Sequence, residues 1–201
     1  KKGLIVESGL SAALKQLKGP LAFLDFETVA LAIPVWDGCR PYDQVPVQLS
    51  VHRQTSKVQI AHHEWLAEGP DDPRESIARK LIEFTQGARS VLAYNAPFEK
   101  RCIQELREHL PRLAAQLRDI EGRLVDLLLL VRDNIYHPGF KGSFALKSVA
   151  PALVPDLSYE GLEITEGGEA SRMLFVLLFK SDEMNKGDRA RLRRSLLEYC
   201  A

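Results

Sequence analysis

The stretch that decides the fold is Leu21-Ala22-Phe23-Leu24-Asp25-Phe26-Glu27-Thr28, in which two carboxylates follow an apolar run. Side chains alternate between the two faces of a β-strand, so residues two apart point the same way. We therefore expect Asp25 and Glu27 to project together from the end of a buried strand. Neighbouring carboxylates repel each other, and Mg²⁺ or Mn²⁺, which prefer oxygen ligands, would compensate their charge. The alternative is a strand end that carries two acids solvated by water.

The composition is that of an ordinary globular protein. The chain has 201 residues, of which 45% are hydrophobic and 27% charged, enough for one domain with a sizeable core. Lysine plus arginine equals aspartate plus glutamate, which excludes a strongly basic protein of the chromatin type but leaves a local basic groove open. Cys39, Cys102 and Cys200 are far apart and form no C-x-x-C pair, so neither a zinc site nor a disulfide framework is indicated. A reducing, cytoplasmic setting fits these cysteines best.

No membrane association is expected from the sequence. No apolar run reaches the length of a membrane span, and residues 1–20 do not have the pattern of a signal peptide. The ends at Lys1 and Ala201 suggest that residues 1–201 form a single domain cut from the C-terminal part of a longer protein. The oligomeric state is not indicated.

The first half of the chain predicts strands joined by a hairpin. A short helix over residues 8–18, with Ser8 as its cap, precedes the strand that carries Asp25. Alternating apolar residues predict further strands over 45–54 and 57–66, connected by a hairpin turn at 54–56.

The second half predicts mainly helices. Asp71-Asp72-Pro73 opens a helix that ends at Gly87, and residues 90–94 form a buried strand. The uniformly apolar run 124–131 is interpreted as a helix, with a strand as the alternative. Further helices are expected over 97–108, from 111, and over 146–153, 169–179 and 186 to the end, with a loop over 136–143 and an irregular segment over 155–164. This order indicates an α/β fold whose mixed sheet has an antiparallel hairpin edge and helices on both faces.

A second motif, Tyr94-Asn95-Ala96-Pro97-Phe98-Glu99, lies where a strand passes into a helix. Asn95 turns the chain, Pro97 occupies the first helical position, and Glu99 lies in the first turn. Clefts in sheets of this kind lie at strand ends, so Glu99 can join Asp25 and Glu27 at a shared metal. The alternative is that Glu99 only complements the positive end of the helix dipole.

Together these motifs resemble the DEDD exonucleases, a superfamily with a ribonuclease H-like fold that includes proofreading exonucleases and ribonuclease D. The chain is more closely similar to an uncharacterised prokaryotic domain family of unknown function that is related to these nucleases. In that family the domain often lies at the C-terminal end of longer nuclease-like proteins. The similarity extends from about residue 20 to the end, and the segments that carry it are 23–28, 33–34, 46–52, 94–99, 125–127, 137–143, 146–151 and 196–200.

The resemblance implies a 3′→5′ exonuclease of the tyrosine subclass that uses two Mg²⁺ or Mn²⁺ ions, about 3.5–4 Å apart. Asp25 would bridge both ions, Glu27 would bind the first ion and position the attacking water, and Glu99 would bind the second. Tyr199 would orient that water or help to deprotonate it. The implied partner is single-stranded or end-frayed nucleic acid, DNA or RNA.

Two features depart from the superfamily pattern. Aspartate is usual at the position of Glu99, and glutamate reaches one methylene further. The tyrosine subclass also has Tyr-x-x-x-Asp on its last helix, which would place the fourth acid two positions beyond Ala201. This segment would then lack one metal ligand and be inactive by itself, although Glu169 is a weaker candidate for a substitute.

Several other residues are candidates for metal or substrate contacts. Asp126 is an acid within an apolar run, so it either joins the metal ligands or accepts hydrogen bonds from the backbone. The candidates for substrate binding lie within or near the motifs, and their alternative roles are core packing or a solvated surface. They are Asn95, Phe26, His137, Lys141 and Lys147.

Two other functions remain open at this stage. The fold could serve a non-catalytic nucleic-acid-binding or assembly module, which Glu99 and the zero net charge favour. A ribonuclease H-like endonuclease or resolvase is less favoured, because Tyr199 belongs to the exonuclease pattern.

Overall fold

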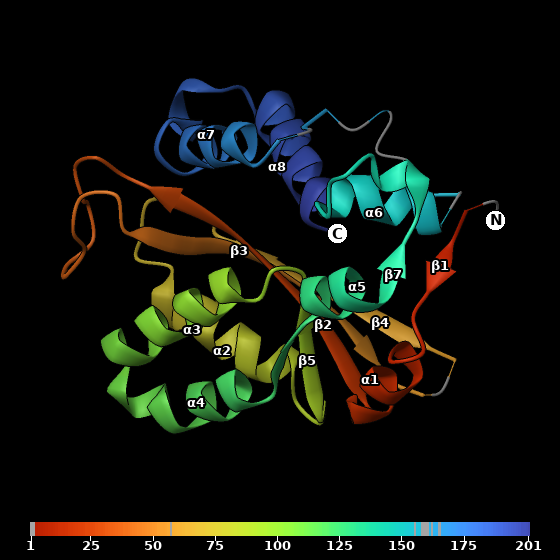
Figure 1. Ribbon diagram of the computed structural model, residues 1–201. Coiled ribbons are helices and arrows are strands. Elements are labelled where there is room, and N and C mark those ends of the chain that lie inside the picture. Colours follow the sequence, from red (N-terminus) through yellow and green to blue (C-terminus); the bar gives the residue numbers. More distant parts are fainter. Residues whose placement is uncertain (1–2, 57, 155, 158–160, 162, 165) are drawn as a thin grey trace.

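The computed structural model describes residues 3–56, 58–154, 156–157, 161, 163–164 and 166–201. It is an α/β protein in which a mixed sheet lies between helices, as Figure 1 shows with α7 and α8 on one side and α2, α3 and α4 on the other. The predicted fold class, with an antiparallel hairpin edge and helices on both faces, is confirmed. In the described part of the chain no helix is long and apolar enough to cross a membrane.

The main sheet is built around β2, its central strand. β3 pairs with β2 in the antiparallel sense and β4 extends this edge, whereas β5 and β6 continue the other edge in parallel. The order in the described residues is β4-β3-β2-β5-β6. Their bounds are β2 Leu21–Ala30, β3 Gln44–Gln54, β4 Ile60–Leu66, β5 Ser90–Ala93 and β6 Leu124–Asp126.

One face of the sheet is sealed by an apolar core. Ala22, Leu24 and Phe26 of β2 point to this face and are buried. They pack against apolar residues that recur at helical spacing, such as Ile77 and Ile103. The helices that supply these residues are α2 Arg74–Phe84, α3 Pro97–His109 and α4 Ala114–Gly122. We call this set the first core.

The opposite face has a second core under α7 Gly167–Phe179 and α8 Lys186–Cys200. The β2–β3 register shifts between Glu27 and Thr28, as in a β-bulge, and this shift divides the apolar residues of β3 between the two faces. Val45 and Val47 join the second core, whereas Leu49 and Val51 join the first. The bulge therefore lies next to Glu27, where the second core gives way to polar side chains.

Shorter elements border the sheet. β1 Ile5–Val6 pairs with β7 Ile135–Tyr136 in the antiparallel sense. The remaining segments are α1 Leu10–Gln16, α5 Leu127–Asn134, α6 Leu146–Leu153 and the 3₁₀ turns η1 Pro111–Leu113, η2 Pro138–Phe140 and η3 Ser181–Glu183. The C-terminal end of α8 lies beside α6 (Figure 1), where Lys147 Nζ is 5.9 Å from the centre of the Tyr199 ring.

Two local predictions differ from the structure, and one pair of strands was not predicted. The helix predicted over 124–131 is wrong at its start, because Leu124–Asp126 forms β6 and the Asp126 side chain caps a helix that begins at Leu127. Ser8 is not a cap, since Gly9 occupies that position without a side-chain bond. The β1–β7 pair was not predicted, because two residues are too few to show alternation. Residue 57 and parts of the irregular segment 155–164 lie outside the described residues.

Candidate metal centre

The centre begins with Asp25 and Glu27, which lie two residues apart on β2. The face that carries them is opposite to that of Leu24 and Phe26, which lie in the first core. Across the sheet Asp25 pairs with Ser50 and Glu27 with Gln48. The two carboxylates thus share the side of the sheet covered by α7 and α8.

Glu99 approaches these carboxylates from the first turn of α3. Asn95 supports this approach, because its left-handed conformation (φ 70°) turns the chain sharply from β5 into the helix. Glu99 is only 3% exposed, and its Oε2 has no hydrogen-bond partner among the residues that the structure describes. A buried carboxylate without a full set of partners is costly, so folding alone does not account for this residue.

The end of α8 completes the centre. The Cys200 thiol donates to Asp25, with 3.7 Å between Sγ and Oδ2. Burial and the charges of Asp25 and Glu27 raise the pKa of Cys200, so the thiol keeps its proton. Burial and the charges of Glu27 and Asp25 raise the pKa of Tyr199 to about 12. Tyr199 therefore lies close enough to both carboxylates for their negative charge to act on its hydroxyl group.

The carboxylates of the centre bind protons more tightly than isolated acids do. Water reaches part of the Asp25 side chain, but protein atoms crowd its carboxylate, and this burial raises its pKa to about 6. Burial, then the charges of Asp25 and Glu99, raise the pKa of Glu27 to about 8, which Lys147 partly opposes. Burial, then the charges of Asp25 and Asp126, raise the pKa of Glu99 to about 8. Without a cation, the excess negative charge is relieved by protons.

Asp126 joins the two loops beside Glu99. Its Oδ1 accepts from Leu128 N at 2.9 Å, which caps α5, and from Asn95 N at 3.1 Å. Asp126 therefore accepts hydrogen bonds from the backbone, which was one of its two possible roles in the sequence analysis. Its charge also acts on Glu99, so Asp126 lies at the margin of the same centre.

The other candidates for substrate binding are dispersed. Phe26 is 2% exposed and belongs to the first core, on the face opposite to Asp25, so its predicted contact with substrate is corrected. His137 Nδ1 accepts from Gly139 N at 3.0 Å and caps η2, and Lys141 is exposed after that turn. Asn95 is exposed, and Lys147 is the cation whose charge acts on Glu27.

Residues that sequence reasoning missed also border the centre. Gln48 is buried and donates through Nε2 to Leu196 O at 2.7 Å, which ties α8 to the sheet one turn before Cys200. Glu166, at the start of α7, adds to the negative charge around Tyr199. Glu169, the weaker candidate for a fourth acid, lies one turn further along that helix. No local sequence pattern marks Gln48 or Cys200, because their contacts join elements that are far apart in the chain.

The donor set is made mostly of carboxylate oxygens, which suits hard cations such as Mg²⁺ and Mn²⁺. Within the described part of the chain, however, no three His, Cys, Asp or Glu side chains are placed to hold one ion. An ion would have to draw the carboxylates together or complete its shell with water and substrate phosphate.

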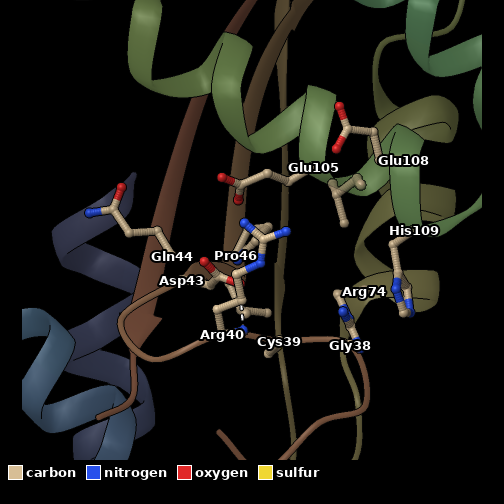
Figure 2. A pocket seen from close by; sticks show the side chains of 12 residues that line it. Gly38, Cys39, Arg40, Asp43, Gln44, Pro46, Arg74, Glu105, Glu108 and His109 are labelled. Atoms are coloured by element: carbon tan, nitrogen blue, oxygen red, sulfur yellow. Dashed lines mark hydrogen bonds between the residues drawn. The ribbon is translucent and has the colours of Figure 1, made fainter.

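A pocket of about 370 Å³ lies elsewhere, between the loop before β3 and the C-terminal half of α3 (Figure 2). Its lining carries both charge signs, including Arg40, Asp43 and Glu105. Arg74 in its wall is held by Asp72, whose carboxylate is 2.6 Å from Nη2, and by the carbonyl of Asp37. None of the residues of the candidate centre lines this pocket, so the pocket is separate from the carboxylates that could bind a metal ion.

The fold and the centre together define an α/β domain with a group of carboxylates on its central strand and on α3. Residues 22–145 match the family model described as Domain of unknown function (DUF2779), and the chain belongs to this family. The matched segment contains Asp25, Glu27 and Glu99 but ends before Tyr199.

The chain is also similar to the "Uncharacterized protein MG366 homolog" of Mycoplasma pneumoniae, with 22% identity over 220 residues. The similarity covers 100% of this chain and 33% of the relative, so the chain spans a third of that relative's length. The expected membership in a domain family of unknown function is thereby confirmed.

Proposed function

We propose that this domain is a metal-dependent nuclease, a 3′→5′ exonuclease that hydrolyses phosphodiester bonds of DNA or RNA with two Mg²⁺ or Mn²⁺ ions. The observation that carries the proposal is the buried Oε2 of Glu99, which has no hydrogen-bond partner in the described residues. Its carboxylate is close enough to Asp25 and Glu27 for their charges to interact. A divalent cation would satisfy that oxygen and offset the charge of all three groups.

The residues of the centre take distinct roles in this proposal. Asp25 and Glu27 hold cations from β2, and Glu99 holds a cation from α3. Ions bound there would stabilise the attacking and leaving oxygens of the phosphodiester. Tyr199, with its pKa raised to about 12, keeps its proton at neutral pH and orients the attacking water through its hydroxyl rather than acting as a base. Lys147, between Glu27 and Tyr199, offers a positive charge to a substrate phosphate.

The expected substrate is single-stranded or end-frayed nucleic acid, since an exonuclease acts on the end of a strand. The net charge of zero means that binding depends on a few local cations, such as Lys147, rather than on a broad basic face. The reducing, cytoplasmic setting is part of the same proposal, because Cys39, Cys102 and Cys200 are all free.

The test is the release of nucleotides by the full-length natural protein. DNA and RNA strands labelled at the 5′ end are incubated with Mn²⁺, with Mg²⁺ or with EDTA. We expect strands shortened stepwise from the 3′ end and free mononucleotides, only with a divalent cation. Asp25→Asn should lower the rate about 100-fold or more, equivalent to ~2.7 kcal/mol of transition-state stabilisation. The matched control is Asp71→Asn, an exposed aspartate outside the centre. Internal fragments would instead indicate an endonuclease.

A non-catalytic nucleic-acid-binding or assembly module is the second candidate function. It is favoured by the lack, among the described residues, of three side chains already placed to hold one ion. Such a module would bind single strands equally well with Mn²⁺ and with EDTA and would release no nucleotides with either ion.

A further inference from the structure

Three ring side chains form a row across the sheet beside the candidate centre. Phe23 on β2 pairs with His52 on β3, and His52 pairs with His62 on β4. Directly paired residues of neighbouring strands have their side chains on the same face. Phe23 precedes Asp25 by two residues, so this row, which we call the ring row, shares the face of the carboxylates. Two residues of a strand extend about 7 Å, which is the spacing along β2 between the ring row and Asp25.

The two histidine rings of the row are held in a fixed stack. Their planes differ by 10°, and the ring centroids are 4.2 Å apart. A hydrogen bond of 3.1 Å joins His62 Nε2 and Ser50 Oγ, and Ser50 is buried. His52 is half-buried and His62 is exposed, so the stack ends in a ring that lies at the surface. A planar ligand that stacked there would meet rings whose orientation is already set, which lowers the entropy cost of binding.

Packing within the domain does not account for the ring row. The second core, under α7 and α8, extends to Leu66, which pairs with Gln48 as Gln48 pairs with Glu27. That row of residues is two rows away from the ring row along the same strands. Among the described residues, Phe23 belongs to neither of the two cores. The helices that cover the rest of this face therefore do not explain why the histidines are stacked.

The charges near the ring row favour the base of a nucleic acid over its phosphates. Burial, and then the charge of His62, lower the pKa of His52, so its ring is neutral at neutral pH. Glu64 is exposed in the neighbouring row, paired with Ser50, and its negative charge repels phosphates. The flat face of a nucleobase suits such a surface, since bases stack on histidine and on other aromatic side chains.

We propose that the ring row binds a nucleobase of single-stranded DNA or RNA, which stacks on the rings of His62 and His52. Because every base has a flat aromatic face, the row accepts a strand without regard to its sequence. A base bound there keeps the strand on the face that carries Asp25 and Glu27. Delivery of the strand end to these carboxylates rests on the proposed nuclease function, whereas stacking of a single strand does not need it.

The test is the binding of a labelled single strand by the full-length protein in EDTA, in which no strand is cleaved. Fluorescence anisotropy of a strand of about 12 nucleotides gives the Kd. His62→Ala removes the outer ring of the stack, so we expect the Kd to rise about tenfold. His62→Phe keeps a ring and should stay within about twofold of wild type. His109→Ala, which removes an exposed histidine beside the separate pocket of Figure 2, should leave the Kd unchanged.

An abasic strand of the same length separates stacking from contacts with phosphates. It keeps the phosphates and lacks the bases, so it should bind wild type more weakly and should not respond to His62→Ala. Circular dichroism checks that the variants fold, and His52→Ala, which removes the inner ring, gives a second test. The stacking site is refuted if both alanine variants bind as wild type does, if wild type does not bind the strand, or if His62→Ala weakens binding of the abasic strand equally.

The same variants distinguish a missing stacking site from a missing nuclease. Nucleotide release with Mn²⁺, together with an unchanged Kd for His62→Ala and His52→Ala, would refute only the stacking site. A raised Kd for these variants, with no nucleotide release by wild type in Mn²⁺ or Mg²⁺, would refute only the nuclease function.

Discussion

The two faces of β2 are built from neighbouring residues but follow opposite rules. On one face Ala22, Leu24 and Phe26 lie in an apolar core with α2, α3 and α4. On the other face Asp25 and Glu27 meet Glu99, Tyr199 and Cys200, and two of these carboxylates have pKa values raised to about 8. The first face stabilises the fold by removing apolar surface from water. The second face reduces the stability of the metal-free protein, which is the pattern expected of a functional site.

The largest expected effect lies on the apolar face. Phe26→Ala removes a ring that is 2% exposed and leaves a cavity in the first core, so we expect a loss of about 3–5 kcal/mol in the free energy of unfolding. Urea denaturation followed by circular dichroism measures this loss. Phe175→Ala, on α7 and 37% exposed, is the matched control and should cost much less. If Phe26→Ala were nearly neutral, the placement of Phe26 in the first core would be wrong.

The carboxylates of the opposite face should lower the stability of the metal-free protein as the pH rises. The folded protein holds protons on Glu27 and Glu99 up to about pH 8, whereas the unfolded chain releases them near pH 4.5. Their contribution to stability is therefore present below about pH 4.5 and is lost as the pH rises through 8. In EDTA we expect the free energy of unfolding to fall by about 2 kcal/mol or more between pH 5 and pH 8.5.

Glu99→Gln tests the source of this pH dependence. The neutral amide removes one of the interacting charges, so the variant should be more stable than wild type at pH 8.5 and should lose less stability over the same range. Thermal denaturation in EDTA provides the comparison. Glu108→Gln, an exposed acid on the same helix, should leave the profile unchanged. A wild-type protein whose stability is constant over this range would contradict the crowding of the three carboxylates.

A smaller effect is expected at the margin of the centre, at Asp126. Asp126→Ala removes the acceptor that caps α5 and holds the Asn95 turn, so we expect a loss of about 1–2 kcal/mol. Asp126→Asn keeps an acceptor oxygen and should lose less. Urea denaturation of both variants separates the capping role from the charge. Equal losses for the two variants would mean that the negative charge of Asp126, and not its hydrogen bonds, stabilises the turn.

The same comparison explains how far the sequence alone could predict the molecule. Alternation in β2 predicted that Asp25 and Glu27 share one face of the sheet, and apolar spacing predicted the helix α2, because burial imposes a regular period. The prediction that Glu99 and Tyr199 lie near β2 rested on the motifs of the resemblance and not on the spacing of residues. Phe26 was assigned to the substrate, although its position between Asp25 and Glu27 places it on the other face by simple alternation. Cys200 was missed because its contact with Asp25 joins residues 175 positions apart, which no local pattern reports.

The smallest expected effect on stability is at Tyr199. In the described residues its hydroxyl has no hydrogen bond that Phe would lose, although the ring packs against the second core and under Lys147. Tyr199→Phe keeps this packing, so the free energy of unfolding should change by less than about 0.5 kcal/mol. Tyr94→Phe is the matched control, since it removes a hydroxyl that donates to Phe144 O at 2.7 Å and should cost about 1 kcal/mol.

If the proposed function is right, the effects of these two variants on the rate of nucleotide release are in the reverse order. Tyr199→Phe should then be slowed about tenfold or more by the loss of the group that orients the attacking water, while Tyr94→Phe stays close to wild type. A Tyr199→Phe variant that is clearly unfolded, or fully active, would remove the hydroxyl from the proposed chemistry.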